Sequence, residues 1–382
     1  MQADQLDAIL DAVRTFVRTE VVPRESEIDQ ADEVPESIRQ QAKKMGLFGF
    51  ALPEEHGGLG LNMEEESRLV MELGYTTPAL RSMFGTNNGI AGHVLLDGGT
   101  PEQQSQWLPR LASGDAVASF ALTEPEAGSD PSDLRTTARR DGQDWVINGS
   151  KRYITNAPVA DVFMVFARTA DTGRAADDIS VFLVPREAAG LTVGPHDRKM
   201  GQFGAWTADV YLDEVRVPAE AMIGNDTTSG YVTAMRCLAH GRVHIAALCV
   251  GMAQRLVDES VSYAQTRKQG GKPIGTFQLV QGLIADSVTD TLAGKSLVLE
   301  VARRFDDNSD RRMGPSAAKY FCSEMVGRVA DRAVQVHGGA GYMRDSAVER
   351  FFRDARLFRL YEGTSQIQQV IIARQVLGRD AS

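Results

Sequence analysis

The sequence predicts an α+β protein in which a β-rich segment separates two helical ones. Helical spacing of apolar residues dominates the first 117 residues, and β-branched and aromatic runs follow over residues 118–226. Long helical patterns then return and continue to residue 382. With 43% apolar residues, the chain can bury a large core without disulfides. We therefore expect three domains, covering residues 1–117, 118–226 and 227–382.

The first segment reads as helices throughout. Apolar residues from Leu6 to Val17 recur at helical spacing, and the pattern stops near Pro23. Pro35 opens a second helix that runs to Met45. Gly-rich breaks separate three further helical patterns, which lie at 63–73, 88–97 and 101–112.

The middle segment carries short β-rich runs, and the last segment carries long helices. A strand at 145–147 leads into a turn at Asn148-Gly149-Ser150, and further strands are expected at 162–166, 179–184 and 208–212. Helical patterns follow at 230–266, 276–305, 315–336 and 366–377. Four helices of this kind predict a bundle.

Composition excludes several classes of function. A net charge of −10 argues against nucleic acid as a partner. No apolar run approaches the roughly 20 residues that span a bilayer. Three cysteines, Cys237, Cys249 and Cys322, form no CxxC pair and indicate a reducing compartment. We expect a soluble, cytoplasmic protein.

Familiar catalytic and metal motifs are absent. No GxGxxG follows a strand, and no serine or cysteine nucleophile signature occurs. His240 and His244 have the i,i+4 spacing of a metal site, but no adjacent Glu or third ligand accompanies them. We expect a packed or solvated histidine pair and no metal.

Glu362 is the strongest catalytic candidate. It stands between the apolar-aromatic run 356–361 and a Gly-Thr-Ser turn that precedes a helical pattern. A carboxylate at such a helix entrance, beside apolar side chains, can act as a base with little competition from water. The alternative is a simple helix start with a capping Thr or Ser.

Three other segments have the composition of a ligand site. Residues 120–130 combine hydroxyls with backbone made accessible by Gly128. Tyr153 and Thr155 are two residues apart, and so share one face of a strand. The Gly-rich turn at 338–341 follows a helix and offers bare amides to phosphate or ribose. Each segment alone is compatible with an ordinary turn or strand.

Together with the Glu362 segment, these motifs resemble the acyl-CoA dehydrogenase family in order and spacing over essentially the whole chain. The segments 53–60 and 273–278 agree as well. The resemblance implies a flavoprotein with N-terminal helices, a central β-barrel-like domain and a C-terminal four-helix bundle. The family's usual assembly is a homotetramer built as a dimer of dimers.

The resemblance also implies roles for individual residues. Glu362 matches the base that removes the α-proton of an acyl thioester, while a hydride leaves the β-carbon for flavin N5. The thioester carbonyl then accepts hydrogen bonds from the base's own backbone N–H and a ribityl hydroxyl. The positions that match FAD contacts are Leu122, Thr123, Gly128, Ser129, Tyr153, Thr155, Thr364 and Gln366.

A second group of matching positions serves the FAD of a neighbouring subunit or the substrate. Arg267, Gln278, Gln335 and Gly339 match contacts to a neighbour's FAD, and Ser129, Arg242 and Gly363 match substrate contacts. Three positions depart from the common pattern: Tyr153 replaces a frequent Trp, Ala239 replaces an acidic residue, and Gly270 stands where a common Arg-x-x-Phe pattern has Phe.

Arg81 is the residue that indicates which kind of acyl chain the protein binds. The Arg81-Ser82 segment resembles that of glutaryl-CoA dehydrogenases, in which this Arg meets the terminal carboxylate of the substrate. A buried Arg without an acidic partner is costly, and an anionic acyl tail relieves that cost. The alternatives are pairing with an acid such as Glu72, or an outward orientation. With Arg81 in the pocket we expect a short dicarboxylyl or sulfinoacyl thioester, and otherwise a short or branched aliphatic one.

Three classes of function remain open at this point. The first is an FAD-dependent dehydrogenase that passes electrons to an electron-transfer flavoprotein. The second keeps the fold for an oxidase, monooxygenase, decarboxylase or desulfinase, and the third is a binding scaffold without catalysis. The intact Tyr361-Glu362-Gly363-Thr364 segment favours the dehydrogenase.

Overall fold

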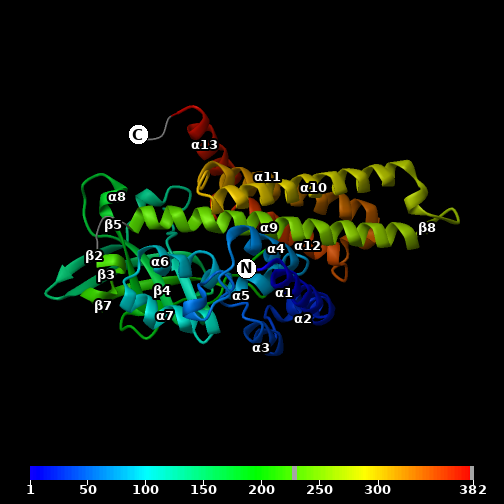
Figure 1. Cartoon of the computed structure of the whole chain (residues 1–382). Helices are drawn as coiled ribbons and strands as arrows, with labels where there is room; N and C mark the ends of the chain where they lie inside the picture. The colour runs from blue at the N-terminus through cyan, green and yellow to red at the C-terminus, as the bar shows by residue number, and fades with distance from the viewer. Residues whose placement is uncertain (226–229, 379–382) are drawn as a thin grey trace.

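The structure is a computed structural model, and it describes residues 1–225 and 230–378. The expected domain boundary between residues 226 and 227 lies outside the described residues. Figure 1 shows long helices stacked along one side of the molecule, with the N-terminal helices and the sheet lying against them. This arrangement agrees with the predicted order of helical, β-rich and helical segments.

The N-terminal segment is helical as predicted. Helix α1 (Ala3–Phe16) continues through a π-helical turn (Val17–Val21) toward Pro23. Two helices start with a capping box, formed by Asn62 with Glu65 and by Thr100 with Gln103. The other helices are α2 (Glu25–Ala31), α3 (Glu36–Lys44), α4 (Met63–Leu73), α5 (Pro78–Asn88), α6 (Ala91–Gly98) and α7 (Pro101–Ser113).

Two details of this segment differ from the prediction. The helix expected at 88–97 is α6, and it is separated by a break at Gly89 from α5, which carries Arg81. Helix α2 was not predicted. It spans only seven residues and ends at Asp32 in the left-handed region, so its apolar pattern is too short to recognise.

The middle segment forms one curled sheet of seven strands with the order β1-β4-β2-β3-β7-β6, and β5 pairs with β4. The central pair, β3 and β7, is antiparallel. The strands are β1 (Ala118–Ala121), β2 (Thr137–Asp141), β3 (Asp144–Thr155), β4 (Val162–Arg168), β5 (Ile179–Pro185), β6 (Leu191–Val193) and β7 (Thr207–Pro218).

The turn predicted at 148–150 is wrong, because β3 runs through these residues. The register of β3 against β7 shifts between Ile147 and Gly149, and again between Lys151 and Ile154. A Cβ at Gly149 would lie 2.4 Å from Thr136 Oγ1. The glycine therefore marks a bulge with close packing, a signal that resembles a turn in the sequence.

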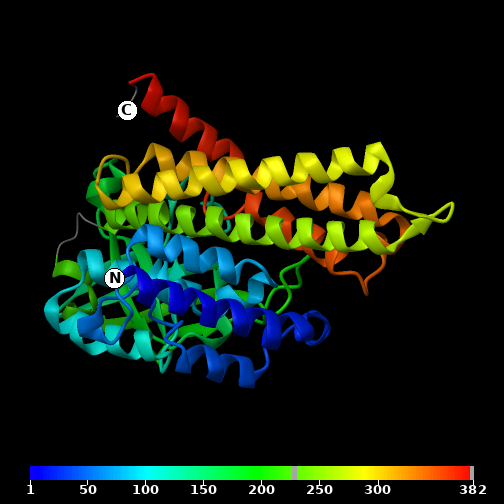
Figure 2. The ribbon, with the colours of Figure 1, turned by 45° about the vertical axis from the view of Figure 1, so that its right-hand side comes forward.

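Three long helices form the other side of the molecule. Helices α9 (Gly230–Thr266), α10 (Gln278–Asp306) and α11 (Met313–His337) pack side by side, and a hairpin of β8 (Lys268–Gln269) and β9 (Lys272–Pro273) joins the first two. Figure 2 shows them stacked above the N-terminal helices. The last helices are α12 (Ala347–Ala355), which was not predicted, and α13 (Ser365–Val376), which packs on α11.

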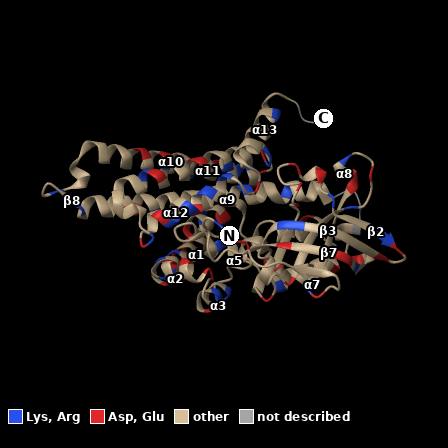
Figure 3. Cartoon of the chain, turned by 180° about the vertical axis from the view of Figure 1, so that it is seen from behind, with Lys and Arg blue, Asp and Glu red and all other residues tan. Residues whose placement is uncertain are grey.

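Helix α9 connects the parts of the molecule. Its residues 239–253 are all buried, and it contacts α4, α6, α10, α11 and β5. Charged residues of both signs are interspersed over the helices and the sheet (Figure 3). In the described part of the chain, no helix combines the length and apolar character needed to cross a membrane.

Candidate active site

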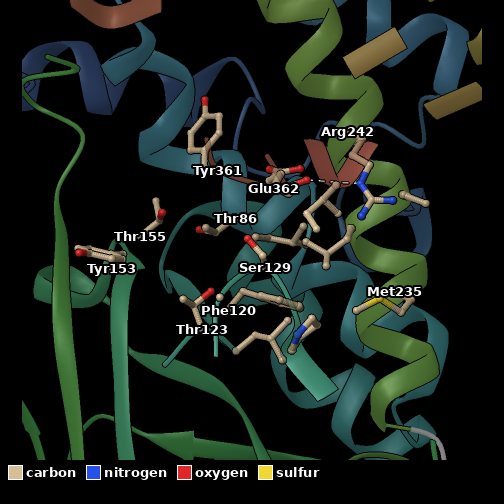
Figure 4. A pocket seen from close by; sticks show the side chains of 18 of the residues that line it. Thr86, Phe120, Thr123, Ser129, Tyr153, Thr155, Met235, Arg242, Tyr361 and Glu362 are labelled. Atoms are coloured by element: carbon tan, nitrogen blue, oxygen red, sulfur yellow. Dashed lines mark hydrogen bonds between the residues drawn. The ribbon is translucent and has the colours of Figure 1, made fainter. Parts of the chain in front are cut away.

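A cavity of about 850 Å³ lies where the sheet, α5, α9 and the segment before α13 meet. Figure 4 shows Glu362 beside Arg242 on one side, with Thr123, Ser129, Tyr153 and Thr155 facing them from the sheet side. The structure thus brings together residues that are far apart in sequence. The predicted site residues that line the cavity are Arg81, Leu122, Thr123, Gly128, Ser129, Tyr153, Thr155, Arg242, Glu362 and Gly363.

Glu362 sits in a tight turn at the entrance of α13. Glu362 and Gly363 both have positive φ, 52° and 86°. Thr364 is the N-cap of α13, and its side chain accepts a hydrogen bond from the Ile367 N–H. The expected helix start with a capping Thr is therefore confirmed, since Thr364 follows Glu362 by two residues. A non-glycine residue in the left-handed region is uncommon and indicates a site held by its surroundings.

Side chains from α9, α11 and α13 hold the two carbonyls of this turn. Gln368 Nε2 donates to the carbonyl oxygens of Glu362 and Gly363, at 3.0 Å each. Lys319 Nζ from α11 donates to the Gly363 oxygen at 2.6 Å, and Arg242 Nε from α9 to the Glu362 oxygen at 3.4 Å. The backbone at Glu362 is therefore fixed from three directions.

The carboxylate of Glu362 is left free by the protein. Its Oε2 is buried and has no hydrogen-bond partner among the described residues. Gly241 on α9 provides the space, since a Cβ there would lie 2.4 Å from Oε2. Burial raises the pKa of Glu362, and the nearby cations Arg81, Lys319 and Arg242 oppose that rise. An unpaired carboxylate at a cavity wall is suited to taking a proton from a bound ligand.

The sheet side of the cavity offers an aromatic face and hydroxyl groups. Tyr153 is 58% exposed although it lines the cavity, and a Cβ at Gly128 would meet only Thr123 Cγ2 at 3.9 Å. Thr123, Ser129 and Thr155 add hydroxyls. This wall fits a flat heterocycle that stacks on one face and accepts or donates hydrogen bonds at its edge.

A buried ion pair that the sequence did not reveal supports this wall. Lys151 Nζ on β3 donates to Glu124 Oε1 at 2.7 Å and to the Leu122 oxygen at 3.2 Å. Glu124 also accepts from the backbone N–H of Arg135 and Thr136. The pair ties the loop after β1 to β3, and 27 residues separate its two members in the sequence.

The remaining predicted cofactor residues do not line the cavity. Arg267 follows α9, Gln278 begins α10, and Gln335 and Gly339 lie at the end of α11. All four residues are exposed. The rings of Tyr263 and His337 stack with centroids 4.3 Å apart, which joins the ends of α9 and α11 at this distant part of the molecule. Thr364 and Gln366 also lie outside the cavity lining.

Arg81 is buried and faces the cavity, so the outward orientation is wrong. Pairing with Glu72 is also wrong, because Glu72 binds Arg14 and Arg18 on the surface. Arg81 is 8% exposed, its Nη2 lies 3.2 Å from His244 Nδ1, and its Nε is buried without a partner.

The histidine pair has a third partner that sequence reasoning missed. His240 and His244 both place Nε2 near Glu66 Oε2, at 3.1 Å and 2.5 Å. All three residues are buried, and their candidate ligand atoms lie within 4.8 Å of one another. Because 178 residues separate Glu66 from His244, no local motif pointed to the contact.

Comparison with known proteins identifies the family. The chain matches the acyl-CoA dehydrogenase N-terminal domain over residues 3–115, the middle domain over 119–215 and the C-terminal domain over 228–377. The chain belongs to the acyl-CoA dehydrogenase family. The protein is therefore an oxidoreductase of this family, and FAD is its cofactor. The open aromatic face of Tyr153 and the hydroxyls beside it fit that cofactor.

Individual relatives cover almost the whole chain. A probable acyl-CoA dehydrogenase YngJ from Bacillus subtilis is 40% identical over 97% of this chain and 97% of its own length. The caffeyl-CoA reductase-Etf complex subunit CarC from Acetobacterium woodii is 35% identical over 98% and 99%. The crystal structure of glutaryl-CoA dehydrogenase from Mycobacterium smegmatis has a TM-score of 0.92 at 31% identity, covering 100% of this chain and 96% of that one.

Proposed function

We propose that the protein catalyses the α,β-dehydrogenation of an acyl-CoA thioester to the trans-2-enoyl-CoA, with Glu362 as the base. The observation that carries the proposal is the buried, unpartnered Oε2 of Glu362 at the wall of the cavity. The side-chain oxygen of a carboxylate needs a partner when it is buried, and a bound acyl chain supplies one in the form of its α-C–H.

In this mechanism the chain orients the substrate and moves one proton. The turn at Glu362, held by Gln368, Lys319 and Arg242, keeps the carboxylate at a fixed position. The α-proton moves to Glu362, and the backbone N–H of Glu362 is a donor for the thioester carbonyl as negative charge develops there. Bound FAD would supply the acceptor for the hydride of the β-carbon, so that one proton and one hydride would leave the substrate.

We assign the cavity residues Leu122, Thr123, Gly128, Ser129, Tyr153 and Thr155 to FAD, and Ser129, Arg242 and Gly363 to the substrate thioester. Their place on the cavity lining supports this assignment. Thr364 and Gln366 would contact FAD from the segment of the base. The side chain of Arg242 also supports the backbone of Glu362, so its effect extends beyond substrate binding.

We further propose a homotetramer in which one subunit completes the FAD site of another. Arg267, Gln278, Gln335 and Gly339 would hold the neighbour's FAD, and their exposed position away from the cavity supports a role outside their own site. Apolar side chains are exposed along α10, including Leu279, which is 87% exposed, and Leu292, which is 60% exposed. An apolar surface of this kind is typical of a face that another subunit covers.

An electron-transfer flavoprotein is the proposed electron acceptor. The relative CarC is named as a subunit of an Etf complex, which supports this choice. The three cysteines are free and buried, in keeping with a reducing, cytoplasmic location.

For the acyl chain we propose a short thioester that ends in an anion, with Arg81 as its partner. The buried Nε of Arg81 without a partner supports this class. The same feature favours a second candidate reaction, oxidative decarboxylation or desulfination of such an anionic acyl-CoA. An oxidase is distinguished by oxygen consumption without an added acceptor.

The product identifies the reaction. The purified holoenzyme is incubated anaerobically with glutaryl-CoA or butyryl-CoA and an artificial electron acceptor, and the thioesters are analysed by mass spectrometry. Dehydrogenation yields a product two hydrogens lighter, whereas oxidative decarboxylation of glutaryl-CoA also removes CO2. Bound FAD with neither product from either thioester would contradict the proposed function.

A further inference from the structure

Arg81 belongs to a buried chain of polar groups that runs from the cavity into the core. Its Nη2 lies 3.2 Å from His244 Nδ1, and His244 Nε2 lies 2.5 Å from Glu66 Oε2. The three residues come from α5, α9 and α4, and His244 is fully buried. These contacts connect Arg81, which lines the cavity, to Glu66, which does not line it.

Hydrogen-bonding capacity determines where the proton of His244 lies. A guanidinium can only donate, so Nδ1 of His244 must accept from Arg81. The proton of the neutral ring is then on Nε2, which donates to Glu66. Burial lowers the pKa of His244 to about 3, in agreement with a neutral ring between the two charges.

Gly85 on α5 and Gly89 at its end leave space for the guanidinium of Arg81. A Cβ at Gly85 would lie 2.7 Å from Arg81 Cζ and 2.8 Å from Nε. A Cβ at Gly89 would lie 3.3 Å from Arg81 Nη2. The guanidinium therefore lies across its own helix in a space that a methyl group at Gly85 would fill.

A second histidine contacts Glu66 as well. His240 Nε2 lies 3.1 Å from the same Oε2, so two imidazoles converge on one carboxylate oxygen. A direct Arg81–Glu66 pair would neutralise the guanidinium and occupy up to two of its five N–H donors, which would weaken its attraction for an anionic ligand. With a neutral ring between them, the charge of Glu66 balances that of Arg81 while the guanidinium remains at the cavity.

We propose that His244 is a positioning residue for acyl-chain specificity: it separates Arg81 from Glu66 and, with Gly85, holds the guanidinium at the cavity wall to receive an acyl chain that ends in a carboxylate. This inference rests on the proposed function, because the acyl chain must enter this cavity.

The first test measures selectivity in two variants that act on Arg81 from opposite sides. His244→Ala removes the spacer, and Gly85→Ala pushes the guanidinium from its place. Flavin reduction by glutaryl-CoA and by butyryl-CoA is followed anaerobically in the holoenzyme. Both variants should weaken a hydrogen bond between Arg81 and the substrate carboxylate. The ratio of kcat/KM for glutaryl-CoA to kcat/KM for butyryl-CoA should therefore fall about tenfold or more. At a pH well above the acid limb, the loss should appear as a higher KM for glutaryl-CoA, with a much smaller change for butyryl-CoA.

His244→Gln should restore much of the ratio, because its amide can accept from Arg81 and donate to Glu66. His93→Asn is the matched control. His93 packs on His240 with ring centroids 3.8 Å apart, and His240 in turn packs on His244, which contacts Arg81. Replacement of His93 should therefore leave the ratio unchanged. A ratio that is equally low in the Ala, Gln and Asn variants would overturn the positioning role.

Glu66→Gln separates charge from geometry. It keeps an oxygen for His244 but removes the buried counter-charge of Arg81, so the thermal unfolding temperature should fall while the preference for glutaryl-CoA stays or rises. A fall in that preference would contradict the role of His244 as a spacer. Stoichiometric metal in the purified holoenzyme, measured by elemental analysis, would also overturn it, because the two histidines and Glu66 would then be ligands.

Failure of this inference is distinct from failure of the proposed function. If the wild type reduces its flavin with either thioester but the variants keep its selectivity, His244 has no positioning role and the dehydrogenase proposal stands. If neither thioester reduces the bound flavin of the wild type, the proposed function itself fails.

Discussion

Two buried arginines border the same cavity and are held in different ways. Arg242 directs Nε to the backbone oxygen of Glu362 at 3.4 Å and Nη1 to Ser316 Oγ at 3.5 Å. Within residues 1–225 and 230–378, the side-chain bond of Arg81 is the one from Nη2 to a neutral histidine, and its Nε has no partner there. The protein thus uses Arg242 to support the base and keeps Arg81 available. The difference indicates that reactivity and acyl-chain selectivity reside at separate places.

Replacing the base tests the reactive part of this comparison and should have the largest effect. Glu362→Gln keeps the size of the side chain and the backbone turn but cannot accept a proton. The rate of flavin reduction by butyryl-CoA in stopped-flow experiments should fall by about 10²–10⁴. The variant should still bind FAD, as its visible spectrum will show. Reduction at the wild-type rate would rule out Glu362 as the base.

A methyl group added at Gly241, next to the Glu362 carboxylate, should have the next largest effect on the rate of flavin reduction. Gly241→Ala places a Cβ 2.4 Å from the present position of Glu362 Oε2, so the carboxylate must move. A displacement of this order costs about a hundredfold in the rate of flavin reduction. Gly194→Ala, directly after β6, is the control, because the nearest atom to a Cβ there is the Asp209 carbonyl oxygen at 3.6 Å, an ordinary contact. Equal rates in both variants would show that the position of Oε2 is unimportant.

Removal of Arg242 should slow every substrate alike. Arg242→Ala loosens the carbonyl of Glu362, and the loss of a hydrogen bond from a charged donor predicts a decrease in kcat of about tenfold or more. The comparison uses butyryl-CoA and glutaryl-CoA under identical conditions. A decrease in kcat confined to glutaryl-CoA would mean that Arg242 also recognises the end of the acyl chain.

Removal of Arg81 should instead have a smaller effect, and one that is confined mainly to substrates that end in a carboxylate. At a pH well above the acid limb, where Glu362 is ionised in both proteins, Arg81→Ala is expected to lower kcat/KM for glutaryl-CoA about tenfold, in line with a lost charged hydrogen bond. At that pH the value for butyryl-CoA should change much less. Parallel Kd values from flavin absorbance changes locate the loss in binding. Unchanged selectivity would remove Arg81 from recognition of the acyl chain.

The pH dependence connects the two arginines and should show the smallest change. Glu362 must be ionised to accept a proton, so activity falls as pH drops through its pKa, which burial raises above that of an ordinary glutamate. Arg81 opposes this rise. In Arg81→Ala the acid limb of kcat/KM for butyryl-CoA should therefore move to higher pH. A shift to lower pH would contradict the electrostatic contact.

The sequence predicted those features that depend on neighbouring residues. Glu362 and its capping Thr364 are two residues apart, and Tyr153 and Thr155 share one strand, so both could be recognised locally. Their roles came from the family resemblance. The α, β, α order followed from periodicity, because long apolar stripes repeat many times within α9, α10 and α11.

Features that depend on distant residues were not predictable in this way. The Lys151–Glu124 pair, the space at Gly241 and the contact of His244 with Glu66 all join separate elements. Helix α12 was missed for a related reason: its buried Arg350 and partly buried Arg353 pair with Glu25 and Asp29 near the N-terminus. A charged residue whose partner is some 320 positions away looks like a surface residue in the sequence.

The central claim is that Glu362 removes the α-proton of an acyl thioester in this cavity. The most direct measurement is anaerobic bleaching of the flavin absorbance of the wild type and Glu362→Gln by butyryl-, isovaleryl-, octanoyl-, succinyl- and glutaryl-CoA. We predict that the wild type bleaches with at least one short thioester, most strongly with one ending in a carboxylate, and that the variant keeps its yellow flavin without bleaching. Equal bleaching of both proteins would contradict the claim.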